Sequence, residues 1–479
     1  MLFNSFSFLI FFPVVAVGFF IVPARYQALW LFLASCYFYM AFVPSYLLVI
    51  LSVVLLDFFL APYIERSHGR RRTVFLILSL CGNIGILFLF KYFNFLNINI
   101  AALVETLNWN YDPWLIEMAL PLGLSFHVFQ SLSYIVEVYK GNYPPERNLL
   151  TYALYVMFFP QLVAGPIERP AHLLPQLKIS HVFDEESVIH GLERMGWGFF
   201  KKLVIADNAA IAVNHLYLTA NLDGPAIVLL GILFAFQIYC DFSGYSDIAI
   251  GSARVLGFSL SENFNRPYAA RSISDFWRRW HISLSSWFRD YVYIPLGGNR
   301  RGVMRNVFNV FVTLFLSGLW HGAAWTFVLW GMLHGAFLVT ERLTLGIRSR
   351  VSTFYSHKSW SRAMAFLQIA ITFVLVTVGW LIFRASSVEQ AFYLLSHSTI
   401  GLEKLFDFHY MRYTLLTEMM IGISKSQLVI IFLAILIMEF VQFHMSKQQV
   451  SNPFEIVPNH YRIAARYFLI CFVMFFGYF

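Results

Sequence analysis

The chain has 479 residues, of which 59% are hydrophobic and only 13% are charged, and its mean hydropathy is +0.64. Soluble globular domains carry about 25% charged residues, so this composition excludes an ordinary soluble enzyme and predicts a polytopic membrane protein. The formal net charge of +8 fits basic loops on the inner side of a membrane. No segment resembles a nucleic-acid-binding module, so nucleic acid is not an expected partner.

Apolar segments long enough to cross a bilayer recur along the whole chain. The first, Met1 to Phe20, lacks a basic n-region and a small-residue cleavage site, so we expect a retained membrane helix and not a removed signal peptide. Because about 20 apolar residues span a bilayer, the pattern predicts an all-α protein of roughly 11 to 13 membrane segments. We expect a single membrane domain over residues 1–479. The expected spans lie near 2–22, 28–60 (two pieces broken at Pro44), 73–96, 118–138, 149–164, 188–218, 225–256, 303–320, 323–341, 364–384, 426–444 and 462–479.

The loops alternate in charge, which predicts their sides of the membrane. Residues 65–72 are strongly basic and are expected in the cytoplasm, whereas residues 97–117 contain three acidic residues and no lysine or arginine. The region 257–305 is again basic, with eight arginines, and so is the loop from Arg342 to Arg362. Both are expected on the cytoplasmic side.

A basic and aromatic helix is predicted within 257–305. Ser272 followed by Asp275 fits a capping box, so the helix should begin near Ile273, and Pro295 should end it. At helical spacing, Trp280 and Trp287 lie on one face, and His281 falls on the aromatic side. Such a helix is expected at the cytoplasmic interface, with its rings in the apolar phase and its arginines at headgroup level.

Two functions fit this helix. It could be held to anionic membrane lipid, with His281 as a packed structural residue. Alternatively, it could form a vestibule for a phosphate-bearing donor such as coenzyme A, because the planar guanidinium of arginine donates two hydrogen bonds to a phosphate. The residues that we assign to donor binding are Arg278, Arg279, Trp280 and Arg289.

His321 ends an apolar run, and an ionisable side chain at membrane depth indicates function. It is flanked by Gly318 and Gly322, a small-xxx-small spacing that lets another backbone approach closely. We expect it to face a crowded interior or a cavity. An imidazole is well suited to proton transfer near neutral pH, so His321 is a candidate catalytic residue, with a structural or pore-lining role as the alternative.

Other patterns limit the chemistry. The four cysteines show no CxxC spacing and no HExxH occurs, so we predict neither disulfides nor a bound metal. We also expect no permanently bound cofactor. The absence of GxSxG leaves a serine-hydrolase mechanism unsupported. Tyr239 to Asp247 is the densest polar insertion in an apolar span, and it either lines a cavity or braces the histidine site.

Long motifs resemble a known family. DFWRRWHISLSSWFRDYVYIPLGGNR (275–300) followed by SGLWHGAAWTFVLWG (317–331) resembles the membrane-bound O-acyltransferases, most of all their bacterial branch for alginate O-acetylation, the AlgI branch. FFPQLVAGPIERP (158–170) and YCDFSGYSDIAIG (239–251) support the resemblance. It implies a helical bundle around a funnel or tunnel. It maps the family's invariant histidine onto His321 and a second signature position, histidine or asparagine in different branches, onto His281.

The resemblance implies a membrane O-acetyltransferase in the bacterial cytoplasmic membrane. Its co-substrate would be acetyl-CoA, entering from the cytoplasm, and its acceptor a polysaccharide such as alginate, reached through an extracytoplasmic partner protein. His321 would be the general base, and His281 would hold its tautomer or orient the donor. D-alanyl or other acyl transfer, a non-enzymatic transporter and a recruiting scaffold are the alternatives.

Overall fold

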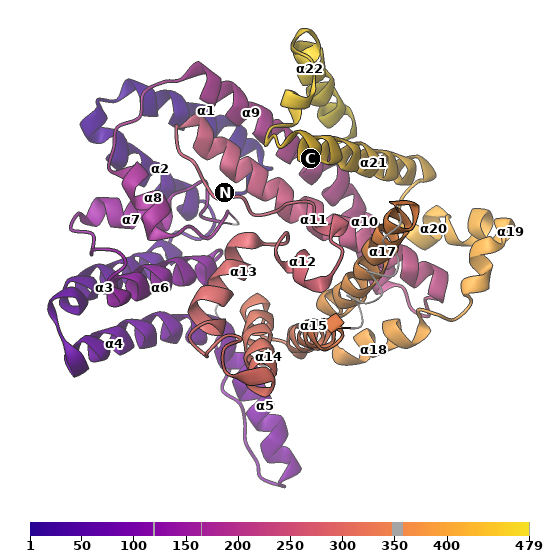
Figure 1. Ribbon diagram of the computed structural model, residues 1–479, viewed down its shortest axis with the longest axis horizontal. Helices are drawn as coiled ribbons and strands as arrows, with labels where there is room; N and C mark the ends of the chain where they lie inside the picture. The colour runs from indigo at the N-terminus through magenta and orange to yellow at the C-terminus, as the bar shows by residue number, and fades with distance from the viewer. Residues whose placement is uncertain (118–119, 164, 347–357, 479) are drawn as a thin grey trace. The chain divides into compact units, whose positions relative to one another are not determined.

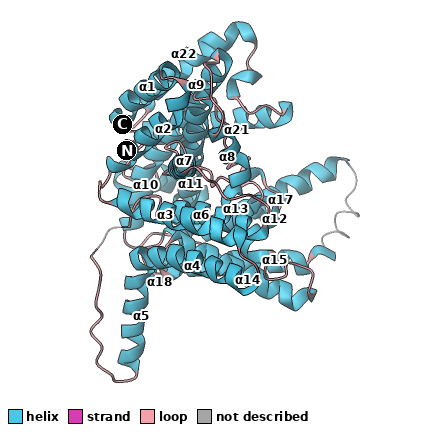
Figure 2. Ribbon diagram, turned by 90° about the vertical axis from the view of Figure 1, so that its left-hand side faces the viewer, coloured by secondary structure: helices cyan, strands magenta, loops and turns pink. Residues whose placement is uncertain are grey.

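The computed structural model describes residues 1–117, 120–163, 165–346 and 358–478. Within these ranges the regular structure is helical throughout and no strand occurs (Figure 2). The expectation of an all-α membrane protein is therefore confirmed.

The chain divides into two compact units. The first comprises Met1–Met195 with Ile248–Ser261, and the second comprises Gly196–Asp247 with Glu262–Phe479. Helices α9 (Glu185–Phe199) and α11 (Gly224–Val255) each contribute residues to both (Figure 1). The expectation of one domain over residues 1–479 stays a prediction.

The first unit contains α1 to α8 together with parts of α9 and α11. The expected break at Pro44 is present, because one helix ends at Met40 and the next begins at Tyr46. Asp57 on α3 is fully buried and accepts hydrogen bonds from Ser79 and Asn83 on α4, so these two apolar helices also share a polar contact. The helices are α1 (Phe6–Ile21), α2 (Gln27–Met40), α3 (Tyr46–Arg66), α4 (Gly69–Leu87), the π-helix η2 (Phe88–Tyr92), α5 (Phe93–Thr106), α6 (Leu124–Lys140), α7 (Leu149–Met157) and α8 (Pro170–Leu177).

The second unit contains the basic segment and both candidate histidines. Its main helices are the π-helix η3 (Phe200–Ala206), α10 (Asp207–Leu218), α12 (Ile273–Trp277), α13 (Ile282–Phe288), the π-helix η5 (Arg289–Tyr293), α14 (Gly302–His321), α15 (Trp325–Leu343), α17 (Lys358–Arg384), α18 (Val388–His397), α19 (Phe408–Tyr410), α20 (Glu418–Ile421), α21 (Lys425–Gln448) and α22 (Asn459–Phe476). Part of the basic loop 342–362, residues 347–357, lies outside the described residues.

Six helical segments of the described chain are long and apolar enough to cross a membrane: 46–66, 69–106, 224–255, 302–321, 362–384 and 425–448. Several other expected spans coincide with shorter helices. The span expected at 149–164 contains the nine-residue α7, which is too short to cross a bilayer because a helix rises only about 1.5 Å per residue. The span expected at 118–138 begins outside the described residues and continues into α6.

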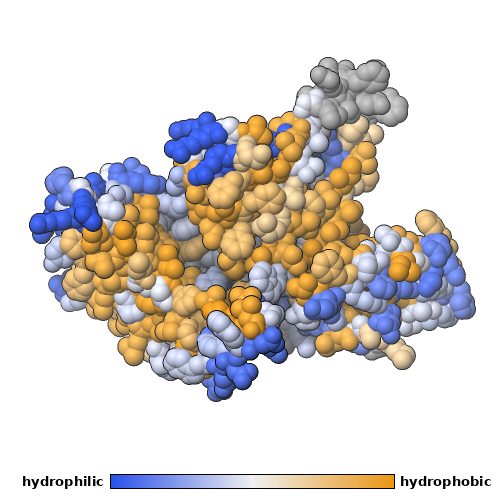
Figure 3. Space-filling view, turned by 90° about the horizontal axis from the view of Figure 1, so that it is seen from below, coloured by the Kyte–Doolittle hydropathy of each residue, from blue (hydrophilic) through white to orange (hydrophobic). Residues whose placement is uncertain are grey.

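Large apolar side chains are exposed on the surface, as a multi-pass membrane protein requires. Leu433, Leu436 and Phe440 on α21 are 50%, 67% and 63% exposed. Apolar residues, in orange, cover much of the face shown in Figure 3, and hydrophilic residues gather toward its margins. Exposed apolar area of this extent marks an interaction surface, and in this chain the partner is membrane lipid.

Helices α14 and α15 approach each other at backbone distance. A Cβ atom added to Gly318 would lie 2.3 Å from the Phe327 carbonyl oxygen, and one added to Gly331 would lie 2.3 Å from the Leu314 carbonyl oxygen. The close approach expected at Gly318 is therefore confirmed. At Gly322 the space is filled by the Phe327 ring instead of a backbone.

Candidate active site

The segment that carries His281 is broken and is not the single helix that its periodicity predicts. The predicted start is confirmed, because α12 begins at Ile273 and the Ser272 hydroxyl accepts a hydrogen bond from the Asp275 N–H at 3.2 Å. The helix ends at Trp277, however, and α13 starts only at Ile282. The expected aromatic face of a continuous helix is therefore wrong.

A second segment of the chain causes this break. The Asn265 N–H donates to the Arg279 carbonyl at 2.9 Å, and the Ile282 N–H donates to the Asn263 carbonyl at 2.9 Å. These bonds satisfy backbone groups that a continuous helix would pair internally. Between them, His281 takes the left-handed conformation, with φ 42° and ψ 57°. Such backbone conformations in residues other than glycine cluster at functional sites.

His281 is fully buried. Its Nδ1 atom lies 3.1 Å from Oδ1 of Asn263, and its ring meets Phe242 edge-on at 4.6 Å between centroids. Burial, and to a smaller extent the nearby charge of His321, lowers the pKa of His281 well below its ordinary value. The neutral imidazole is therefore the favoured form.

His321 is the last residue of α14 and is partly buried in an aromatic cluster. Its ring lies 4.9 Å from Trp320, 5.1 Å from Trp330 and 5.3 Å from Phe383, measured between centroids. The Trp320 ring is also 5.9 Å from His281. The structure thus brings the two histidines, 40 positions apart in the sequence, to one tryptophan.

A cavity of about 600 Å³ is lined by residues of α12, α13, η5, α14 and α15, and neither His281 nor His321 is among its lining residues. Leu284, one turn after His281, and Ser317, one turn before His321, belong to its wall. Ligand pockets commonly have volumes of about 300–1,000 Å³, so a substrate-sized molecule fits. The lining residues are Ser274, Trp277, Arg278, Leu284, Ser285, Phe288, Arg289, Tyr293, Asn299, Asn306, Val310, Thr313, Leu314, Ser317, Leu338, Val339, Glu341, Arg342 and Leu345.

Two of the four residues assigned to donor binding line this cavity. Arg278 and Arg289 do so, and Arg342 adds a third guanidinium that the sequence analysis did not select. Arg279 instead pairs with Asp275, with Nε 2.9 Å from Oδ1. Trp280 is only 2% exposed and packs in the core of this unit, 4.8 Å from the Trp380 ring.

Ion pairs join the polar insertion of α11 to the π-helix η3. Lys201 pairs with Asp247 and donates to the Ser243 hydroxyl at 3.0 Å. Lys202 lies 2.6 Å from Asp241 and 2.8 Å from Asp207. None of these residues is among those lining the cavity described above. These ion pairs brace α11 against η3, and the expected support of the histidine site stays a prediction.

The sequence pattern did not single out Asn263, whose side chain contacts His281 in the structure. Its side chain is fully buried, and its amide nitrogen donates to the Ser246 hydroxyl of α11 at 3.3 Å. The available signal was a polar run, Glu262 to Arg266, placed directly before the histidine segment. Nothing in its spacing indicates which side chain it would meet.

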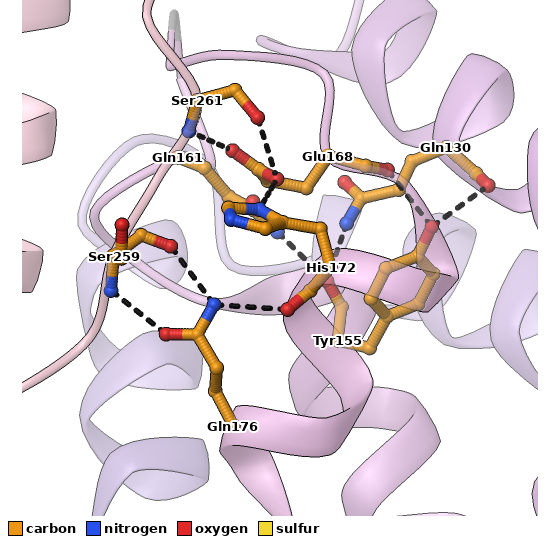
Figure 4. Close-up of polar contacts among 8 residues, drawn as sticks. All are labelled: Gln130, Tyr155, Gln161, Glu168, His172, Gln176, Ser259 and Ser261. Atoms are coloured by element: carbon orange, nitrogen blue, oxygen red, sulfur yellow. Dashed lines mark hydrogen bonds and ion pairs between the residues drawn. The ribbon is translucent and has the colours of Figure 1, made fainter.

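In the first unit, a polar cluster connects α8 to residues 259–261 (Figure 4). The fully buried Glu168 carboxylate accepts hydrogen bonds from the Ser261 N–H at 2.6 Å and from the Ser261 hydroxyl at 3.1 Å, and it pairs with His172 at 2.6 Å. The Gln176 amide both accepts from and donates to the Ser259 backbone. The hydrogen bond with Glu168 raises the pKa of His172 above its ordinary value.

The sequence pattern of the membrane-bound O-acyltransferase family matches residues 146–388. The chain belongs to this family. The match includes Glu168, Asn263, His281, the cavity residues and His321. The protein is accordingly an O-acyltransferase, as expected from its motifs.

Relatives cover most of the chain. A probable alginate O-acetylase AlgI of Pseudomonas putida is 39% identical over 82% of this chain and 79% of its own length. The Pseudomonas aeruginosa protein of the same description is 36% identical over 95% of this chain and 84% of its own length. A peptidoglycan O-acetyltransferase of Helicobacter pylori is 35% identical, with coverages of 82% and 78%.

Proposed function

We propose that this O-acyltransferase transfers acetyl groups from acetyl-CoA toward a polysaccharide outside the cytoplasm. The observation that carries the proposal is the cavity of about 600 Å³, whose wall includes Leu284 and Ser317, each about one turn from a candidate histidine, and the three arginines Arg278, Arg289 and Arg342. Three guanidinium groups against one carboxylate, Glu341, suit a donor with several phosphates.

In the proposed reaction, His321 is the general base. It takes the proton of an acceptor hydroxyl as the hydroxyl oxygen attacks the thioester carbonyl. The resulting tetrahedral intermediate expels the thiolate of coenzyme A, which takes up a proton, and an acetyl ester remains on the acceptor. His321 fits this role because its ring is fixed by Trp320, Trp330 and Phe383 and is only partly buried.

The relatives support the acetyl group and the type of acceptor. Their descriptions name acetyl transfer to alginate and to peptidoglycan, which are both cell-envelope or exported glycans. We therefore place the protein in the bacterial cytoplasmic membrane, with the arginine-rich segment 257–305 on the cytoplasmic side, where acetyl-CoA is available. An extracytoplasmic partner protein would pass the acetyl group to the polymer.

The test uses purified protein in lipid nanodiscs with radiolabelled acetyl-CoA, an added acceptor glycan and candidate partner proteins. Release of free coenzyme A and labelling of the acceptor are measured for the wild type, for His321→Ala and for His460→Ala. His460 is exposed on α22, so its variant is a matched control. We expect His321→Ala to reduce turnover by about 100-fold or more, with His460→Ala unchanged.

Two outcomes would contradict this function. One is wild-type turnover in His321→Ala protein of normal abundance. The other is a wild type that releases no coenzyme A from acetyl-CoA but turns over with a D-alanyl or a longer acyl thioester, which would reassign the donor.

A further inference from the structure

The side-chain oxygen of Asn263 is surrounded by hydrogen-bond donors. It lies 2.9 Å from the Ser283 hydroxyl, 3.3 Å from the Ser283 backbone nitrogen and 3.1 Å from Nδ1 of His281. On its other side, the amide nitrogen donates to the Ser246 hydroxyl at 3.3 Å. Asn263 and Ser246 are 0% and 2% exposed, so water does not compete for these contacts.

The hydrogen bond from the Ser283 backbone N–H fixes the orientation of the Asn263 side-chain amide. A backbone N–H can only donate, so the atom of Asn263 that faces Ser283 has to be the oxygen. The same oxygen faces Nδ1 of His281, and an amide oxygen can only accept. Nδ1 of His281 therefore carries a hydrogen, and in the neutral ring the lone pair belongs to Nε2.

The His281 ring cannot flip, so that Nε2 takes the place of Nδ1, without losing its contacts with neighbouring residues. The Ile282 N–H is bound to the Asn263 carbonyl at 2.9 Å, and the ring packs against Phe242 at 4.6 Å. The titratable neighbour acting on it is His321 on α14, whereas Asn263, Ser283, Phe242 and Trp320 are uncharged.

We propose that Asn263 is a positioning residue of the acyltransferase reaction, which fixes His281 as the Nδ1–H tautomer so that Nε2 acts as a hydrogen-bond acceptor. This inference rests on the proposed function. With this tautomer, Nε2 can accept a hydrogen bond from a group in the site. That group is either the hydroxyl that receives the acetyl group or the protonated ring of His321. In this tautomer His281 cannot donate a hydrogen bond from Nε2 to the thioester carbonyl oxygen or to its oxyanion, because that bond would need an Nε2–H.

The decisive measurement is the ¹⁵N spectrum of histidine-labelled protein in nanodiscs, because nitrogen shifts distinguish the two neutral tautomers. The chain has 14 histidines, so the His281 signals are assigned as those lost in His281→Gln. We expect Nδ1–H in the wild type and in Ser283→Ala, which keeps the backbone donor. An Nε2–H tautomer in the wild type would overturn the inference.

Kinetics provide a second readout. Asn263→Asp keeps an oxygen acceptor but buries a carboxylate, so we expect turnover to fall less than in Asn263→Leu; the carboxylate should move the acidic limb of the kcat/KM profile to higher pH. Asn263→Leu removes the acceptor, and we expect kcat to fall about 10–100-fold with KM for the donor little changed. Equal losses in both variants, with normal melting temperatures, would overturn the positioning role.

The two proposals fail in different ways. A protein that does not use acetyl-CoA still gives a histidine spectrum, so the tautomer is measured independently of the donor. Conversely, an active enzyme with Nε2–H at His281 would retain the proposed function and refute the role of Asn263.

Discussion

At the scale of single residues, one buried charge of the second unit is held by a partner of opposite sign. Lys201 is 3% exposed and Asp247 is 8% exposed, and they pair directly within the second unit. Removing one member of such a pair leaves an uncompensated buried charge, which costs far more than losing a pair at the surface. The exposed pair of Arg147 with Glu65 offers the comparison.

We predict that Lys201→Met lowers the free energy of unfolding by about 3–5 kcal/mol, whereas Arg147→Met lowers it by no more than about 1 kcal/mol. The double variant Lys201→Met/Asp247→Leu should recover much of the loss, because it removes both charges. Thermal unfolding in detergent compares these three variants with the wild type. Equal effects of Lys201→Met and Arg147→Met would refute the argument.

At the scale of elements, the cluster around Glu168 makes the attachment of α8 dependent on pH. The pKa of His172 is raised above its ordinary value of 6.5 by the hydrogen bond with Glu168. Protonated His172 therefore stabilises the folded state. This contribution is fully present below about pH 6.5 and is lost as the pH rises through the raised folded value.

We predict that wild-type stability falls as the pH rises from about 6 to 8, and that His172→Gln flattens this part of the profile, since glutamine donates to Glu168 without titrating. Because His172 is partly exposed, solvent will reduce the effect. Melting temperatures across this range test it, with His460→Gln as the control. A slope unchanged by His172→Gln would exclude the pair as its source.

Local chemistry explains which elements the sequence could predict. The start of α12 was predictable because Ser272 and Asp275 cap it from within four residues. The break after Trp277 was not, because the groups that cause it, Asn263 and Asn265, belong to a distant turn. For the same reason the sequence offered His281 and His321 as candidates but not Asn263, and it could not separate Arg278 from Arg279.

At the scale of the whole molecule, sidedness follows from the segment 69–106 in the first unit. This continuous helical segment has 38 residues, and it bends at the π-helix η2 between α4 and α5 (Figures 1 and 2). Its two ends carry opposite charge, which the positive-inside rule assigns to opposite sides of the membrane. Arg70 to Arg72 begin the segment, and Glu105 lies near its end.

We predict that a cysteine placed at Arg70 is labelled by a membrane-impermeant maleimide only from the cytoplasmic side, and one placed at Glu105 only from the outside. The background should lack the native cysteines, two of which, Cys81 and Cys471, are exposed. Intact cells and inverted vesicles distinguish the sides. Labelling of both positions from one side would refute the topology.

The backbone at position 281 limits which residues an active enzyme can have there. At φ 42° the chain occupies the left-handed region, which asparagine, aspartate and histidine enter more readily than other side-chain-bearing residues. The buried, uncharged surroundings disfavour aspartate. Histidine and asparagine remain, the two residues that the family resemblance associates with this position. We therefore expect the main-chain conformation at position 281 to restrict the residue type before the reaction chemistry does.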